Sequence, residues 1–250
     1  MLDISLIIRA RNERAALERL LREIDRQDFT GAIELVVVDG GSTDASIELA
    51  GDHGATIVAL AQADFTYPKS LNVGLAACSH EVVVEIVAHA LPFSKTWLSD
   101  GVSHFSDPTV AGVYGPVLAL EGASPAEVDF YRGGYEAAER RGPHSVAPGA
   151  MGIFGATNIA LRRSLWHRHP FDERYEAGGE DGQWAGWAVH EGYKIINDHR
   201  FSVRHSHGLS AKGLEYQLEY WSKLGRPLPF NDPELVRLRE QIAANRSNPT

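Results

Sequence analysis

The sequence predicts an α/β fold in which a mostly parallel, mixed sheet is flanked by helices, with a helical tail at the C-terminal end. Short runs of apolar and β-branched residues alternate with helical patterns over residues 4–105, which is typical of parallel strands joined by crossover helices. The chain has 250 residues, of which 44% are hydrophobic, so a domain of this size can bury a sizeable core. We therefore expect a single α/β unit followed by the tail.

The first strands and helices follow from this alternation. Strands are expected at residues 4–10, 33–40, 55–60 and 81–87, and helices at 13–27, 43–52, 69–78 and 94–105. In the first helix, Leu17, Leu20, Leu21 and Ile24 recur at three- and four-residue spacing and form one apolar face. Asn12 precedes this helix and is expected to be its N-cap.

The second half has a less regular order of elements. Strand-like segments are expected at 110–120, 156–163, 193–197 and 201–205, helices at 125–141 and 180–191, and two amphipathic helices within 210–245. The last two helices are separated by "GRPLPFNDP", whose glycine and prolines interrupt a helix. The C-terminal tail is therefore expected to be helical.

Composition excludes several classes of partner. The net charge of −9 and the pI near 5.6 leave no overall basic field for a nucleic acid. The single cysteine, Cys78, excludes an intrachain disulfide and suits a reducing compartment. No run approaches the roughly 20 apolar residues of a membrane span. We expect a cytoplasmic protein without a transmembrane segment, whose contact with a membrane, if any, is peripheral.

The second predicted strand ends in residues that suit a ligand site. Asp39 closes the strand, Gly40 and Gly41 allow a tight turn, and Ser42 follows. Ligands of open α/β sheets bind at the carboxyl ends of the strands, where Asp39 would lie. The alternative is an ordinary strand-to-helix loop. A dinucleotide site is disfavoured, because no G-x-G-x-x-G follows a strand.

Five segments together resemble a known family. "SLIIRARNE", "ELVVVDGGSTD", "FTYPKSLNVGLAAC", "HALPFSKTWL" and "GGEDGQWAGWAVHEGYKI" come in the order and at about the spacing seen in family-two glycosyltransferases of GT-A fold. They are most similar to the bacterial cell-surface polysaccharide branch, which includes rhamnosyltransferase-like enzymes. The resemblance implies a GT-A domain at 1–208, with a nucleotide-binding half at 1–110 and an acceptor and catalytic half at 111–208. Residues 209–250 would be a helical extension.

The resemblance also implies which residues bind the nucleotide. Asp39 would hydrogen-bond the nucleobase, and Lys69 would lie near the diphosphate. The full set implied for the nucleotide is Ala10, Arg11, Asn12, Glu13, Asp39, Gly40, Ser42, Lys69 and Asn72. Without the resemblance, Lys69 would be read as a solvated surface charge.

Two adjacent acids are the catalytic candidates. Glu180 and Asp181 open a predicted helix, where carboxylates are favoured by the helix dipole alone. The resemblance implies that Asp181 is the general base that takes the proton of the acceptor hydroxyl, with Glu180 orienting it. It also places Gly155, Ala156, Thr157, Asn158 and Trp184 along the sugar and acceptor pocket, with turn residues and core packing as the alternatives.

The sequence departs from the family where a metal is usually bound. The family carries Asp-x-Asp after the fourth strand, whereas this chain has Val87, Ala88 and His89. His89 could be a structural histidine, a ligand for a softer metal, or an imidazolium that neutralises the leaving diphosphate. His205 and His207, two apart on a predicted strand, could complete a site with it; the alternative is a pair of exposed histidines in a turn. We expect a divalent cation, manganese or magnesium, to assist.

The function predicted is an inverting glycosyltransferase that moves a sugar from a nucleotide-diphosphate sugar to a hydroxyl of a saccharide or lipid-linked acceptor. One rival is a non-catalytic nucleotide-sugar-binding protein that has lost its metal acids, although Glu180 and Asp181 are retained. A histidine-rich metallohydrolase is a second rival, supported only by the spacing of His205 and His207. The oligomeric state is left open.

Overall fold

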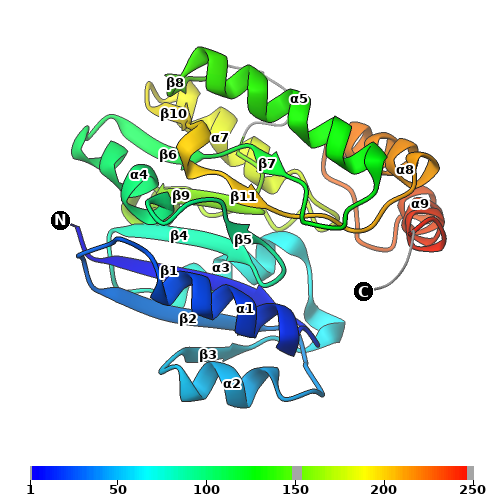
Figure 1. Cartoon of the computed structure of the whole chain (residues 1–250), viewed down its shortest axis with the longest axis horizontal. Coiled ribbons are helices and arrows are strands. Elements are labelled where there is room, and N and C mark those ends of the chain that lie inside the picture. Colours follow the sequence, from blue (N-terminus) through cyan, green and yellow to red (C-terminus); the bar gives the residue numbers. More distant parts are fainter. Residues whose placement is uncertain (1, 148–153, 247–250) are drawn as a thin grey trace.

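The centre of the computed structural model, which describes residues 2–147 and 154–246, is an eight-stranded mixed sheet (Figure 1). Its strands are β1 (Ile4–Ala10), β2 (Ile33–Asp39), β3 (Thr56–Ala59), β4 (Val82–Val87), β6 (Val110–Tyr114), β8 (His144–Ser145), β9 (Asn158–Arg162) and β10 (Lys194–Asn197). They lie in the order β3-β2-β1-β4-β9-β6-β10-β8. A second sheet, in the order β5-β11-β7, contains β5 (Leu91–Pro92), β7 (Val117–Leu118) and β11 (Val203–Arg204).

The pairing confirms the predicted mostly parallel, mixed sheet. β1 pairs in parallel with both β2 and β4, and β2 pairs in parallel with β3. β9 runs antiparallel between β4 and β6, and β8 is antiparallel to β10. The carboxyl ends of β1, β2 and β4 therefore meet at one edge of the sheet, where ligands of such sheets bind.

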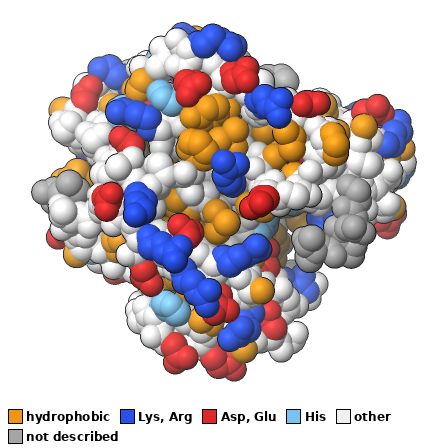
Figure 2. All heavy atoms as spheres, in the orientation of Figure 1, with side chains coloured by type: hydrophobic (Ala, Val, Ile, Leu, Met, Phe, Trp, Pro, Cys, Tyr) orange, Lys and Arg blue, Asp and Glu red, His pale blue; other side chains and the backbone are white. Residues whose placement is uncertain are grey.

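Helices cover both faces of the sheet. They are α1 (Arg14–Asp25), α2 (Ser46–Asp52), α3 (Tyr67–Ala77), α4 (Trp97–Ser103), α5 (Pro125–Arg141), α6 (Arg163–Arg168), α7 (Glu180–His190), α8 (Ala211–Lys223) and α9 (Pro233–Ala244). The apolar sides of α1 and α4 share one core with β1 and β4, whereas α3 and α7 pack in a second core on the opposite face. The outward side of α1 carries charges of both signs (Figure 2), as its amphipathic pattern predicts.

The C-terminal helices α8 and α9 pack against each other around Leu235, Leu238 and Ile242. The same cluster includes Ala177, which lies in the loop before α7. Short 3-10 helices occur at Gln62–Asp64, His104–Ser106 and His199–Phe201. In the described ranges 2–147 and 154–246, no helix combines the length and the apolar character needed to cross a bilayer.

Two local predictions need correction. Asn12 is not the N-cap of α1, because Glu13 occupies that position and makes no side-chain cap hydrogen bond. Asn12 adopts φ +53° instead, and its Oδ1 accepts a hydrogen bond from the Thr43 amide at 2.7 Å. The strand expected at 201–205 is shortened to β11, since a 3-10 helix occupies His199–Phe201.

Candidate functional site

The predicted nucleotide-binding segments adjoin one another at the carboxyl edge of the sheet. The Gly40 amide donates to the Ala10 carbonyl at 3.0 Å, and the Asn12 amide donates to Ser42 Oγ at 2.9 Å. Arg11 and Glu13 lie in the same β1–α1 loop, where Arg11 is exposed. The loops after β1 and β2 thus form a continuous rim beside β4.

Asp39 shapes the turn at this rim. Its side chain accepts hydrogen bonds from the Gly41 amide at 3.0 Å and from the Ser42 amide at 3.1 Å, and only 4% of the residue is exposed. Carboxylates and backbone amides form turns of this kind without a ligand. The ordinary loop interpretation therefore accounts for these contacts, and the nucleobase contact of Asp39 stays a prediction.

The two predicted residues of α3 have different surroundings. The Lys69 ammonium is partly exposed and lies 3.6 Å from Oδ1 of Asp64, so it is free to move toward a ligand. Asn72 instead holds the segment after α6: its Nδ2 donates to the Phe171 carbonyl at 2.9 Å, and its Oδ1 accepts from Trp166 Nε1 at 2.9 Å. The Asn72 amide is thus used in a structural bridge, and its nucleotide contact stays a prediction.

Glu180 and Asp181 begin α7 in very different environments. Glu180 is 2% exposed, its Oε2 has no hydrogen-bond partner in the described part of the chain, and burial with the charge of Asp181 raises its pKa to about 8. Asp181 is partly exposed, and its oxygens accept from the Ala156 amide at 2.9 Å and the Gly182 amide at 2.7 Å. Desolvation raises the pKa of Asp181 as well, against these hydrogen bonds. Because both pKa values are raised, the pair holds a proton more readily than two free carboxyl groups would.

A buried ion pair that the sequence analysis did not single out lies behind these acids. Arg9 Nε donates to Glu85 Oε1 at 2.7 Å, and Arg9 Nη2 donates to the Ala156 carbonyl at 2.7 Å. Burial raises the pKa of Glu85 to about 7, although Arg9 opposes this shift. The sequence contains a signal for this pair, because Arg9 and Glu85 each place one charge in a strand that is otherwise largely apolar. β1 and β4 are paired with Arg9 opposite Val87, which puts Arg9 and Glu85 on one face.

The residues expected along the sugar pocket divide into two groups. Gly155 is exposed and Thr157 is partly exposed, while Ala156 links Arg9 to Asp181 through its backbone. Asn158 and Trp184 are buried, and their sugar contacts stay predictions. Oδ1 of Asn158 accepts a hydrogen bond from Trp97 Nε1, and its Nδ2 donates one to the Phe201 carbonyl. Trp184 has no exposed surface and stacks on Phe154 with ring centroids 5.4 Å apart. Both side chains therefore stabilise the core.

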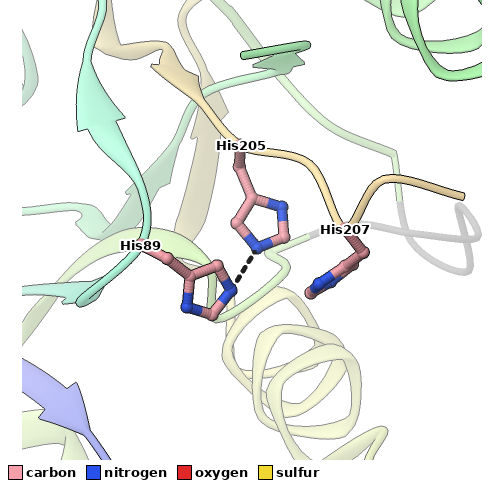
Figure 3. Close-up of side chains that lie close together, drawn as sticks. All are labelled: His89, His205 and His207. Carbon is pink, nitrogen blue, oxygen red and sulfur yellow. Dashed lines mark hydrogen bonds between the residues drawn. The ribbon is translucent and has the colours of Figure 1, made fainter. Parts of the chain in front are cut away.

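Three histidines meet at the end of β4 (Figure 3). His89 follows β4, whereas His205 and His207 follow β11. Nε2 of His89 lies 2.9 Å from Nε2 of His205, and one ring nitrogen from each of the three histidines can be chosen so that all lie within 4.8 Å of one another. Burial, with the neighbouring histidines, lowers the pKa of His205 well below its usual value and that of His207 to about 4. His205 and His207 are therefore neutral at pH 7 and can offer lone pairs.

This donor set fits a divalent ion. Neutral imidazoles are common metal ligands, and three of them converge here. Val87 and Ala88 supply no side-chain ligand in place of the family's acids. The site can thus hold a cation, but through nitrogen rather than carboxylate oxygen.

The family model for Glycosyl transferase family 2 matches residues 5–169. The chain belongs to this family. Among curated proteins, this family-2 glycosyltransferase is 26% identical over 183 residues to the O-antigen chain rhamnosyltransferase WbaN of Salmonella anatum, covering 72% of this chain and 58% of that protein. It is 25% identical over 216 residues to the O-antigen chain rhamnosyltransferase RfbN of Salmonella typhimurium, covering 84% of this chain and 68% of that one. The chain thus spans 58% of the length of WbaN and 68% of the length of RfbN.

Solved structures confirm the GT-A fold of the family-2 glycosyltransferase. The mannosyltransferase PcManGT from Pyrobaculum calidifontis, in complex with GDP-Man and Mn²⁺, superposes with a TM-score of 0.66 at 22% identity over 98% of this chain and 76% of that one. TarS from S. aureus in complex with UDP gives a TM-score of 0.62 at 16% identity over 97% of this chain and 70% of that one. At these identities the likeness concerns the fold.

Proposed function

We propose that this family-2 glycosyltransferase transfers a sugar, with inversion, from a nucleotide-diphosphate sugar to a hydroxyl of a saccharide or lipid-linked acceptor. The observation that carries the proposal is the acid pair at the start of α7, in which Asp181 is oriented by the Ala156 and Gly182 amides. The rhamnosyltransferase relatives support a saccharide acceptor. GDP-Man and UDP in the neighbouring structures support a nucleotide-activated donor.

Asp181 is the proposed general base. Each of its oxygens accepts one backbone hydrogen bond, and a carboxylate oxygen has a second lone pair for an acceptor hydroxyl. The pKa of Asp181 is raised by desolvation, which makes its carboxylate a stronger base. Glu180, largely protonated with a pKa of about 8, can lie beside it without adding a second full negative charge.

The leaving diphosphate is proposed to lie at the opposite side of the anomeric carbon. Lys69 and the rim formed by the loops after β1 and β2 would bind the nucleotide diphosphate, with Asp39 contacting the base. A divalent cation held by His89, His205 and His207 supplies positive charge against the diphosphate when it is bound. A base on one side and a charged leaving-group site on the other suit direct displacement, and hence inversion.

The proposed division of labour follows the fold. Residues 1–110 would bind the nucleotide, residues 111–208 would bind the acceptor and supply the base, and residues 209–250 would support the loop before α7. We place the reaction in the cytoplasm, where the free and buried thiol of Cys78 would stay reduced.

Asp181→Asn tests this function. Purified protein is assayed with UDP-, GDP- and dTDP-sugars and saccharide acceptors, and nucleoside diphosphate binding is followed by calorimetry. We expect turnover to fall about 10²- to 10⁴-fold with nucleotide affinity nearly unchanged, whereas Asp52→Asn, at an exposed position on α2, keeps full activity. Near-normal turnover of Asp181→Asn would remove it from the mechanism. Tight nucleotide binding by the unaltered protein, without transfer or donor hydrolysis, would favour the rival binding protein.

A further inference from the structure

The three histidines form a convergent set of ligands from two parts of the chain. His89 comes from the end of β4, and His205 and His207 come from the segment after β11 (Figure 3). The ring centroids are 4.7 Å apart for His89 and His205, 5.5 Å for His89 and His207, and 4.5 Å for His205 and His207. Three rings this close leave room for one shared ion rather than for separate ligands.

The ring of His89 has a carboxylate beside its far nitrogen, and His205 and His207 are held through their backbone amides. Glu13 Oε1 lies 2.5 Å from Nδ1 of His89, the ring nitrogen opposite the one that faces His205. The buried Glu127 accepts the His207 amide through Oε1 at 2.9 Å, and the Leu118 carbonyl accepts the His205 amide at 2.7 Å. A carboxylate behind a ligating histidine is the usual outer support of a protein metal site, because it fixes the ring and raises its basicity.

The chemistry of the donors selects the ion. Magnesium requires oxygen ligands in near-octahedral geometry, and manganese also favours carboxylates. Imidazole suits zinc, iron, nickel and copper better, and three imidazoles with one open position are a known zinc arrangement. At a metal site made of carboxylates and completed by a diphosphate, much of the affinity for the metal ion comes from the nucleotide. Three nitrogen ligands from the protein can bind a metal ion without the nucleotide.

We infer that His89, His205 and His207, supported by Glu13, bind an imidazole-preferring divalent ion such as Zn²⁺ in the absence of nucleotide and in preference to Mg²⁺ and Mn²⁺. The open coordination position is then available to an oxygen of the diphosphate, a role that rests on the proposed function. The binding itself does not depend on that role. The ion thus binds to the protein itself and does not need the sugar donor in order to bind.

The test uses the full chain, stripped of metal with a chelator and kept free of nucleotide. Titration with Zn²⁺, Mn²⁺ and Mg²⁺ by calorimetry, with elemental analysis after dialysis, gives affinity and stoichiometry, and Co²⁺ reports ligand geometry by visible absorption. We expect one Zn²⁺ per chain, bound at least about 100-fold more tightly than Mg²⁺, and an intense Co²⁺ spectrum typical of low coordination number.

Matched variants assign the site. His89→Ala and His207→Ala should each abolish stoichiometric Zn²⁺ binding, and Glu13→Gln should weaken it about 10- to 100-fold. His53→Ala, which removes an exposed histidine at the end of α2, should bind as the unaltered protein does. Circular dichroism in chelator identifies any variant that has not folded, and the conservative Glu13→Gln then decides the assignment.

Two results would overturn the inference: Zn²⁺ binding that appears only after a nucleoside diphosphate is added, or Zn²⁺ binding that survives both His89→Ala and Glu13→Gln. The measurement contains no sugar donor, so its failure is separate from failure of the proposed function. Stoichiometric Zn²⁺ without any sugar transfer would refute the function alone. Sugar transfer without stoichiometric Zn²⁺ would refute this inference alone.

Discussion

Arg9 and Glu85 form an ion pair inside the sheet, with Arg9 Nε 2.7 Å from Glu85 Oε1 and with side chains that are 12% and 1% exposed. The other end of the guanidinium donates to the Ala156 carbonyl, and the Ala156 amide donates to Asp181. The pair therefore fixes the backbone unit that orients the proposed base. It acts through Ala156 and is a positioning element.

Arg9→Met should destabilise the protein by about 3–5 kcal/mol, because it leaves a buried carboxylate without its partner. The double variant Arg9→Met/Glu85→Met should recover much of this loss, since no unpaired charge remains. Transfer by the double variant should still be reduced in kcat, because the donor to the Ala156 carbonyl is missing. Urea unfolding and steady-state kinetics measure the two effects. Full activity of the double variant would contradict the positioning role.

Glu180 makes the folded state more stable in acid than in base. Its pKa is about 8 in the folded protein against 4.5 for a free side chain. Between these values the folded protein keeps a proton that the unfolded chain has lost, so the free energy of unfolding falls as pH rises, by up to about 1.4 kcal/mol per pH unit. Glu180→Gln should flatten this fall between pH 5 and pH 8 in urea titrations. An identical pH dependence in both proteins would mean that Glu180 titrates normally.

Gly179 is required by its conformation and by a close contact. It has φ +97°, and a Cβ placed there would lie 2.3 Å from the Leu224 carbonyl oxygen. Gly179→Ala should therefore cost several kcal/mol and displace the start of α7, lowering kcat. Gly186→Ala is the matched control: it lies within α7 with no atom near its added Cβ, and should stabilise the protein by about 0.5–1 kcal/mol. Equal unfolding midpoints for the two variants would refute the contact.

Lys69 is expected to act on the ligand rather than on stability. Its contact with Asp64 is long and lies at the surface, so Lys69→Ala should change the free energy of unfolding by less than about 1 kcal/mol. Loss of a charged contact to the diphosphate should weaken binding of the tightest among GDP, UDP and dTDP about 10- to 100-fold. Lys212→Ala, on the exposed side of α8, is the control. Unchanged nucleotide affinity would assign Lys69 to the surface.

The sequence predicts the strands and their mostly parallel order well, because apolar periodicity and strand-to-helix alternation are local signals. β1 is predicted at its observed bounds, and α5 likewise. The N-terminus of α1 is predicted less well, because its capping depends on contacts between loops. Asn12 accepts a hydrogen bond from the Thr43 amide across the rim.

The candidate site is predicted in part. The grouping of His89 with His205 and His207 is confirmed as a spatial cluster, in which His89 follows β4 of the large sheet and the other two follow β11 of the small sheet. The internal contacts of Asn72, Asn158 and Trp184 were not predicted, since residue type alone does not distinguish a residue that lines a pocket from one that joins buried segments. The close contact between Glu13 and His89 depends on the β1–α1 loop, whose path no local pattern specifies.

The bond between Tyr220 Oη and the Ala177 carbonyl, and that between the Phe230 amide and Glu176, join the loop before α7 to segments made later on the ribosome. A nascent chain that has exposed Asp181 but not yet residues 220–230 lacks these supports. Because domains fold as their segments emerge, the start of α7 should become fully supported only after residues 220–230 have left the ribosome.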